Sequence, residues 1–273
     1  TQVGSSAASD VYKRQAEYIR EIENGEIVII DKNGIESIKP FPKIDARPCV
    51  FEYIYFARPD SILKGKAVHE YRKNLGNELA KESYVEADMI SPIPDSGLPA
   101  ALGFANKSNI EFDMGIIRNH YVGRTFIEPT QQIRQLGVKL KHNPNKQIIK
   151  NKRIILVDDS IVRGTTSKKI VDMLYHAGAK EIHLRVSSPP IKYPDYYGID
   201  TPNKKDLIAA NLSVDEIAKQ IGVKSLKFLS IEGLYKALGY KNRNDKNPQL
   251  TDHCFTGDYP VKPTDNKLSL IHI

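Results

Sequence analysis

The stretch "RIILVDDSIVRGTTSKKIVDML", residues 153–174, joins an apolar run, two adjacent carboxylates and a helical pattern. Residues 154–157 are apolar without alternation, which is typical of a parallel strand buried on both faces. From Thr166 the apolar spacing becomes helical, and Gly178 provides a helix stop. Residues 181–187, "EIHLRVS", predict the next strand. The segment is therefore a βαβ unit, and its loop lies at the sheet edge where ligands bind in open α/β folds.

The loop of this unit carries residue types that suit a phosphorylated sugar and a divalent cation. Gly164 allows close backbone approach, and residues 165–167 offer hydroxyl and N–H groups at a helix N-terminus, which attracts anions. Asp158 and Asp159 would repel a phosphate unless they bind the ligand's hydroxyls or a metal ion. Taken alone, such an acidic pair is more often a cap or a solvated turn. A Walker nucleotidase or a dinucleotide fold would need glycine motifs that the sequence lacks.

Composition narrows the class of protein. The 273 residues can hold one large domain or two smaller ones, without the ~18-residue apolar run of a membrane span or an apparent secretion signal. Cys49 and Cys254 form no disulfide framework and suit a reducing cytoplasm, which is the expected location. The histidines show no zinc-ligand spacing. The net charge of +7 fits an anionic partner or a plain basic surface, and the dispersed basic residues argue against nucleic acid.

Strands and helices alternate along the chain, which predicts an α/β fold with a mainly parallel sheet flanked by helices. Before it, residues 26–38 predict a β-hairpin with a type I′ turn at Asn33-Gly34. Residues 46–61 predict a buried aromatic strand, and a helix is expected over 64–82.

Further segments continue this alternation. "ADMISPIPDSGLPAALGFA" predicts a strand, a proline-rich turn and a helix, and "FDMGIIR" predicts a strand. Residues 119–130 predict a glycine-containing loop before a basic helix. "LIAANLSVDEIAKQIG" is expected to be partly helical, and "SIEGLYKALG" to form a short helix.

Several segments together resemble one protein family. "VDDSIVRGTT" is similar to the phosphoribosylpyrophosphate (PRPP) motif of type I phosphoribosyltransferases. Over about residues 16–261 the chain resembles the amidophosphoribosyltransferases, in "PCVFEYIYFARPDS", "PIPDSG", "NHYVGRTFIEP", "SSPPIKYPDYYGID", "LIAANLSVDEIAKQIG" and "FLSIEGLYKALG". The resemblance implies a type I phosphoribosyltransferase fold. It also implies formation of phosphoribosylamine and pyrophosphate from PRPP and ammonia, the first committed step of purine biosynthesis.

The resemblance also implies roles for individual residues. Asp158 and Asp159 would hold the ribose hydroxyls and Mg²⁺, and Ser96 matches the remaining metal-associated position. The residues implied to bind PRPP are Asp95, Ser96, Gly97, Asp158, Asp159, Ser160, Arg163, Gly164, Thr165, Thr166 and Ser167. Taken alone, "PIPDSG" would be a proline-stiffened turn.

A loop that closes over PRPP is implied for residues 119–130. There Arg124 would face pyrophosphate, while Tyr121 and Phe126 would line a path for ammonia; Arg124 and Tyr121, with the acidic pair, are the implied catalytic residues. Arg118 matches a position associated with nucleotide feedback in the family, although a solvated charge explains it equally well.

The resemblance divides the chain into four parts: a tail outside the family (1–15), a remnant of the glutaminase domain with the hairpin (16–45), the phosphoribosyltransferase domain (46–240), and an extension with a tail (241–273). The family's glutaminase domain begins with a catalytic cysteine, whereas this chain begins with Thr1. Use of ammonia but not of glutamine is therefore expected.

A cofactor and several partners follow from the same resemblance. Some family members bind a [4Fe–4S] cluster through four cysteines. Cys49 and Cys254 match two of these positions, but Asp195 and Thr251 occupy the others, so no cluster is expected. Purine nucleotides would act as feedback inhibitors, and the full-length protein would be a homo-oligomer, a dimer or tetramer.

Two alternatives remain open: a PRPP-sensing regulator of the same fold, and a nucleobase salvage transferase. The intact "YVGRTF" segment and the lack of a helix-turn-helix extension disfavour the regulator, and "FEYIYFARPDS" disfavours the salvage enzyme.

Overall fold

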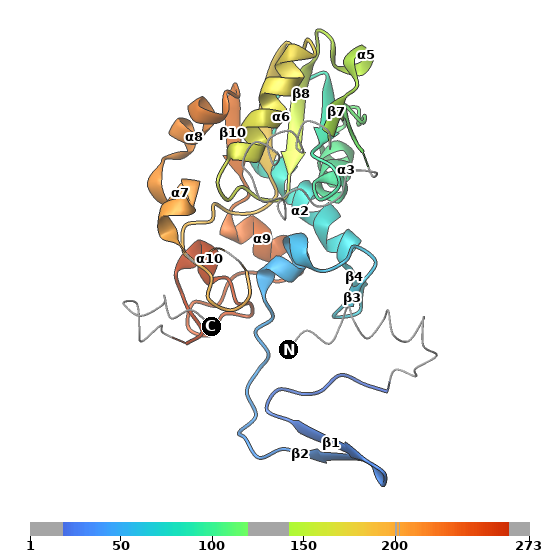
Figure 1. The fold of residues 1–273 in the computed structure, drawn as a ribbon, viewed down its shortest axis with the longest axis vertical. Helices are drawn as coiled ribbons and strands as arrows, with labels where there is room; N and C mark the ends of the chain where they lie inside the picture. The colour runs from blue at the N-terminus through green and yellow to red at the C-terminus, as the bar shows by residue number, and fades with distance from the viewer. Residues whose placement is uncertain (1–18, 120–141, 200, 202, 262–273) are drawn as a thin grey trace, which may run out of the picture.

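A parallel sheet lies in the upper part of the molecule as drawn in Figure 1. The computed structural model describes residues 19–119, 142–199, 201 and 203–261. The sheet has four strands in the spatial order β10-β9-β8-β5, and all neighbours are parallel. Their bounds are β5 (Met89–Pro92), β8 (Arg153–Asp158), β9 (Glu181–Val186) and β10 (Ser225–Phe228). The predicted parallel sheet is confirmed, while β10 has no counterpart among the predicted strands.

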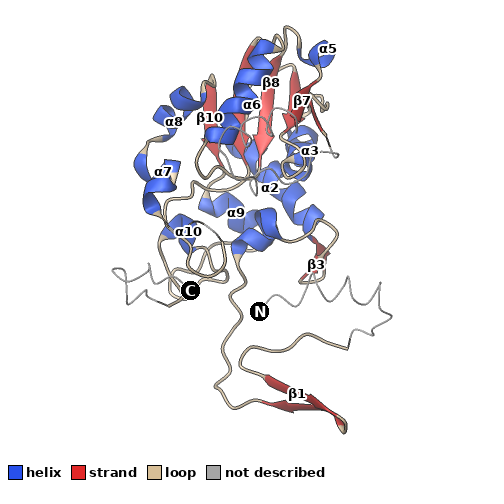
Figure 2. Cartoon of the chain, in the orientation of Figure 1, coloured by secondary structure: helices blue, strands red, loops and turns tan. Residues whose placement is uncertain are grey.

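Helices cover both faces of this sheet (Figure 2). One core contains side chains of α2 (Val68–Ser83), α3 (Leu98–Ser108) and α9 (Ile231–Ala237), and the other contains those of α6 (Thr165–His176) and α8 (Val214–Ile221). Each helix includes a segment for which the sequence predicts a helix. Along β8, Ile155 and Val157 join the first core, whereas Ile154 and Leu156 join the second. This strand is therefore buried on both faces, as its unbroken apolar run predicts.

Short elements complete the described part of the chain. They are β3 (Ile62–Leu63), β4 (Lys66–Ala67), β6 (Ile116–Arg118), β7 (His142–Pro144), α5 (Lys146–Ile149), the 3₁₀ turn η3 (Lys204–Asp206), α7 (Ile208–Asn211) and α10 (His253–Thr256). None of the described helices is long and apolar enough to cross a membrane.

The segment 46–61 does not form the predicted buried strand. Its centre is a π-helical turn, η1 (Glu52–Phe56). The side chain of Arg72 holds this turn, because Nε donates to the carbonyl oxygen of Tyr53 (3.0 Å) and Nη2 to that of Ala57 (2.7 Å). The prediction was wrong because the aromatic content suggested a strand, whereas all the buried positions except Phe51 follow helical spacing: Val50, Tyr53, Ile54 and Ala57.

Two glycines allow α2 and α3 to pack backbone against backbone. A Cβ atom on Gly76 would lie 1.9 Å from the carbonyl oxygen of Ala100, and one on Gly103 would lie 1.9 Å from that of Lys73. Because real Cβ contacts are never so short, only glycine permits this crossing. The crossing fixes α3 on α2, and with it the turn that precedes α3.

The predicted N-terminal hairpin is present as β1 (Ile27–Asp31) and β2 (Gly34–Ile38), and Figure 1 shows it apart from the parallel sheet. Its turn is not of type I′. That type needs positive φ at both loop residues, but the loop residues Lys32 and Asn33 both have negative φ. The positive φ, +123°, belongs to Gly34.

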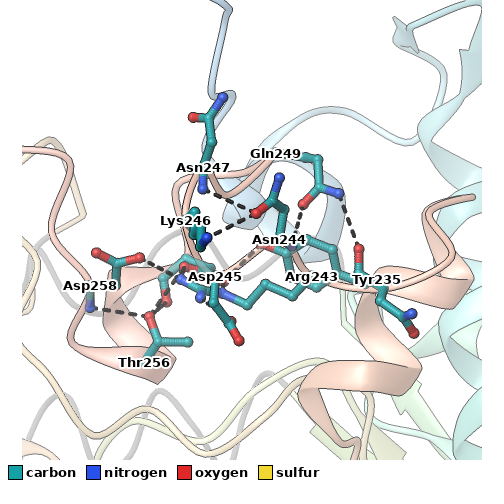
Figure 3. A network of polar contacts seen from close by, with 11 residues as sticks. Tyr235, Arg243, Asn244, Asp245, Lys246, Asn247, Gln249, Thr256 and Asp258 are labelled. Carbon is teal, nitrogen blue, oxygen red and sulfur yellow. Dashed lines mark hydrogen bonds and ion pairs between the residues drawn. The ribbon is translucent and has the colours of Figure 1, made fainter.

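A polar network ties the segment after α9 to the rest of the domain (Figure 3). Arg243 Nε donates to Asp252 Oδ2 and Nη2 to Asp258 Oδ2, both at 2.7 Å, and Nη1 donates to Asp245. The hydroxyl of Tyr235, on α9, donates to the same Asp252 oxygen (2.9 Å). Asp252 is fully buried, and its hydrogen bond with Arg243 contributes most to raising the pKa of that guanidinium. The network therefore anchors this segment on α9.

Candidate functional site

The turn after β5 lies against the end of β8. The N–H of Ile93 donates to the carbonyl oxygen of Val157 (2.8 Å), and a Cβ atom on Gly97 would lie 2.4 Å from that oxygen. The peptide bond between Pro94 and Asp95 is cis. The turn therefore sits beside the start of the β8 loop, and its closest approach requires glycine.

The acidic pair at the end of β8 is buried. The N–H of Asp159 donates to Asp158 Oδ1 (3.0 Å), and the hydroxyl of Ser160 donates to Asp159 Oδ2 (2.6 Å). Burial, and then the negative charge of Asp159, raise the pKa of Asp158 well above its usual range. A cation would relieve both effects, because it supplies the missing positive charge.

This pair fits Mg²⁺, which prefers oxygen ligands and uses one or two carboxylates together with substrate oxygens. Among the described residues, no group of three or more His, Cys, Asp or Glu side chains is arranged to hold a metal ion. Mg²⁺ at Asp158 and Asp159 would thus take further ligands from water, hydroxyls and a bound phosphate ester.

Sequence reasoning missed Arg72, whose guanidinium interacts electrostatically with Asp159. Burial lowers the pKa of its guanidinium, and the charge of Asp159 partly opposes that shift. Arg72 is thus a buried positive charge that interacts with Asp159. A signal exists in the sequence, since an arginine stands in the apolar stripe of α2 formed by Val68, Leu75 and Leu79.

The N-terminus of α6 is open to solvent. Gly164 is the N-cap residue with φ +74° and no side-chain capping hydrogen bond. Thr165 and Thr166 are exposed and Ser167 is buried. The first N–H groups of a helix have no partner within it, so this end presents donors and the positive end of the helix dipole to an anion.

The segment 206–208 braces the loop, a role that sequence reasoning did not assign. The N–H of Ile208 donates to the carbonyl oxygen of Val162 (2.8 Å). A Cβ atom on Gly164 would lie 2.8 Å from Cδ1 of Ile208. Arg163 pairs with Asp206 at 3.5 Å on the exposed side of the loop.

Arg118 forms a salt bridge with the carboxylate of Asp95. It therefore contacts the turn after β5, a contact that the sequence did not predict. Tyr121, Arg124 and Phe126, which the resemblance places in a closing loop, lie outside the described residues.

The positions matched to iron–sulfur ligands lie together but do not fit a cluster. Cys49 and Thr251 form a parallel bridge, and the hydroxyl of Thr251 donates to the backbone of residue 47 (2.7 Å). Asp195 lies 2.8 Å from Nε2 of His253 and accepts N–H groups of residues 197–199. Burial raises the pKa of Cys49 to about 11 and also that of Cys254. A cubane needs four thiolates, and two of these side chains are oxygen groups with other partners.

Taken together, these features have the arrangement of a type I phosphoribosyltransferase fold: a parallel sheet, an acidic pair after β8, the open N-terminus of α6 and the turn after β5. The family described as a phosphoribosyl transferase domain matches residues 65–222, and the chain belongs to this family.

Within it, the chain is similar to amidophosphoribosyltransferases, which confirms the resemblance inferred from the motifs. The protein of that name from Rhizobium etli is 56% identical over 269 residues, covering 94% of this chain and 54% of the relative. That from Bacillus subtilis is 49% identical over 247 residues, covering 90% and 52%.

A comparison with solved structures also finds similarity to this group of proteins. The glutamine PRPP amidotransferase of B. subtilis, complexed with ADP and GMP, has a TM-score of 0.81 at 48% identity, covering 93% of this chain and 55% of that one. The chain thus spans about half the length of the relatives it matches.

Proposed function

We propose that the chain carries the phosphoribosyltransferase activity of an amidophosphoribosyltransferase. It would transfer the phosphoribosyl group of PRPP to ammonia, giving phosphoribosylamine and pyrophosphate, the first committed step of purine biosynthesis. The observation that carries the proposal is the buried pair Asp158–Asp159, followed directly by the uncapped N-terminus of α6. The similarity to amidophosphoribosyltransferases supports ammonia as the acceptor.

The proposed binding mode follows the charges. The N–H and hydroxyl groups of residues 164–167 would bind the 5-phosphate, and the carboxylates of Asp158 and Asp159 the ribose hydroxyls. Pyrophosphate would lie at the turn of residues 95–97, which adjoins the end of β8. The anomeric carbon would then face ammonia between these groups.

The chemistry requires charge stabilisation more than a nucleophilic side chain. As the bond to pyrophosphate breaks, positive charge would develop on the sugar, and the buried carboxylates of the proposed ribose site would favour it. Positioning ammonia near the anomeric carbon supplies much of the remaining rate enhancement. Bound Mg²⁺ would neutralise charge on the leaving pyrophosphate.

The proposal extends to regulation and context. Purine nucleotides are proposed as feedback inhibitors, since the B. subtilis relative was solved with ADP and GMP. A homo-oligomer containing a glutaminase domain, which supplies ammonia from glutamine, is proposed for the full-length protein, with a cytoplasmic location. Residues 46–240 are the proposed transferase domain.

The test is pyrophosphate release by the purified chain with PRPP, Mg²⁺ and ammonium chloride at alkaline pH. We expect release that depends on both PRPP and ammonia, and its loss in the Asp158→Asn/Asp159→Asn variant. Adenine, hypoxanthine and orotate serve as competing acceptors. Release with a nucleobase and none with ammonia, from folded protein, would contradict the proposal and favour a salvage transferase.

A further inference from the structure

A two-stranded ribbon, formed by β6 and β7, contacts the turn after β5 through two side chains. Strands β6 and β7 are antiparallel, and Arg118 pairs with His142 across them. The guanidinium of Arg118 forms a salt bridge with the carboxylate of Asp95. Nε2 of His142 lies 3.3 Å from the carbonyl oxygen of Pro94. Since that carbonyl can only accept, the imidazole donates from Nε2.

The ribbon is itself fixed to the sheet. The N–H of Gly115, just before β6, donates to the hydroxyl of Ser91 in β5 (3.1 Å). The N–H of Asn145, just after β7, donates to the carbonyl oxygen of Gly115 (2.8 Å). Both strands are thus held at the end that lies against β5, so their opposite ends present Arg118 and His142 to the turn at a fixed position.

The salt bridge resolves an electrostatic conflict within the proposed site. Asp95 carries a negative charge in the turn assigned to pyrophosphate, which is also negative. The side chain of Asp95 is 49% exposed and that of Arg118 is 31% exposed, so a ligand bound at this turn could reach the pair. Without Arg118 the turn would repel the ligand assigned to it.

We propose that Arg118 is a positioning residue for the pyrophosphate turn, and that it cancels the charge of Asp95 while His142 holds the adjoining carbonyl. This inference rests on the proposed function. It gives Arg118 a part in substrate binding, in addition to the nucleotide contact that the family resemblance implies.

A double-mutant cycle on PRPP affinity tests the charge cancellation. Arg118→Met should weaken Mg²⁺-dependent binding about tenfold, which is about 1.4 kcal/mol. On an Asp95→Asn background the same change should cost less than about twofold, because no charge is left to cancel. Equal losses on both backgrounds, measured by calorimetry, would overturn the charge-cancelling role.

Hydrogen exchange without ligand tests the positioning role separately from the function. The amide of Gly97 donates to the carbonyl oxygen of Ile93 (3.0 Å) and reports on the turn. Arg118→Met should speed its exchange about fivefold or more, since the turn loses one anchor. The matched control is Arg58→Met, which removes an Arg–Asp pair whose side chains are both 68% exposed, and exchange at Gly97 should not change.

The same amide tests the second anchor. His142→Gln keeps an N–H donor for the carbonyl of Pro94, whereas His142→Leu removes it. Exchange at Gly97 should stay near wild type in the first variant and rise in the second. If Arg118→Met and His142→Leu both leave this exchange unchanged, the inference fails even if the chain binds PRPP. If the chain does not bind PRPP but these amides respond as expected, the proposed function fails alone.

Discussion

Gly97→Ala should damage both the stability of the protein and its affinity for PRPP. The added methyl carbon would lie 2.4 Å from the carbonyl oxygen of Val157 and 3.0 Å from that of Ile93. The shorter contact is about 1 Å inside ordinary van der Waals distance. Both neighbours are backbone atoms, one at the end of β8 and one directly after β5, so they yield less readily than a side chain would.

Two contributions determine how much the free energy of unfolding falls in Gly97→Ala. Overpacking of this kind costs about 1–3 kcal/mol. Loss of the hydrogen bond between Ile93 N–H and Val157 O costs about 1 kcal/mol more. The free energy of unfolding should therefore fall by about 2–4 kcal/mol. For a domain of this size the melting temperature falls about 2–4 °C per kcal/mol, a total of about 4–16 °C.

The assay is thermal unfolding, followed by calorimetric titration with PRPP below the melting temperature. The displaced turn should weaken PRPP binding by about tenfold or more. The control is Lys107→Ala in the last turn of α3, where the side chain is exposed. Its stability should change by less than about 1 kcal/mol. A Gly97→Ala protein with wild-type melting and affinity would refute the close packing of this turn against β8.

Three further predictions concern the acidic pair, the C-terminal network and the thiols. Asp158→Asn should stabilise the metal-free protein by about 0.5–2 kcal/mol near neutral pH while weakening PRPP binding, because it removes a buried charge. The folded state keeps the Asp158 proton to higher pH than the unfolded chain does. The free energy of unfolding of the wild type should therefore fall as pH rises above about 4. In the variant, equilibrium unfolding should show a weaker dependence of this free energy on pH. Arg243→Met should cost about 3–5 kcal/mol in chemical denaturation, since it leaves Asp252 charged and fully buried; near-wild-type stability would contradict this. Anaerobically purified protein should lack stoichiometric iron and sulfide, because a cubane needs four thiolates, only Cys49 and Cys254 stand at the matched positions, and burial raises the pKa of both; a bound cluster would show the opposite.

The elements with strong local patterns are those that the sequence predicted well. Apolar residues are consecutive in β8 and helically spaced in α6, and the loop between the two contains glycine and hydroxyl residues. Strand, loop and helix could therefore each be predicted from the local sequence. The prediction of a strand over residues 46–61 was wrong because aromatic residues favour strands on average, whereas here tertiary packing stabilises a helical turn. β10 was missed because its four residues, "SLKF", carry too short a pattern.

Contacts between distant residues could not be predicted from these patterns. The salt bridge between Arg118 and Asp95 joins positions 23 apart, and the Nε of Arg185 donates to the carbonyl oxygen of Ser83, 102 positions away. Such pairs depend on how strands and helices are placed in space, and local periodicity carries no information about that. For the same reason, the sequence did not predict that Arg72 interacts with Asp159, although the position of Arg72 in the apolar stripe of α2 could be read from the sequence.

The central claim is that Asp158 and Asp159 form a Mg²⁺-dependent PRPP site at the carboxyl end of β8. Calorimetric titration of PRPP into the chain, with Mg²⁺ and then with EDTA, tests it most directly. We predict that binding requires Mg²⁺ and that Asp158→Asn/Asp159→Asn weakens it at least about tenfold, or about 1.4 kcal/mol. Asp60→Asn, which changes an exposed carboxylate in the loop before β3, is the control and should bind as the wild type does. Equal PRPP affinity in the wild type and the double variant, or binding unaffected by EDTA, would contradict the account.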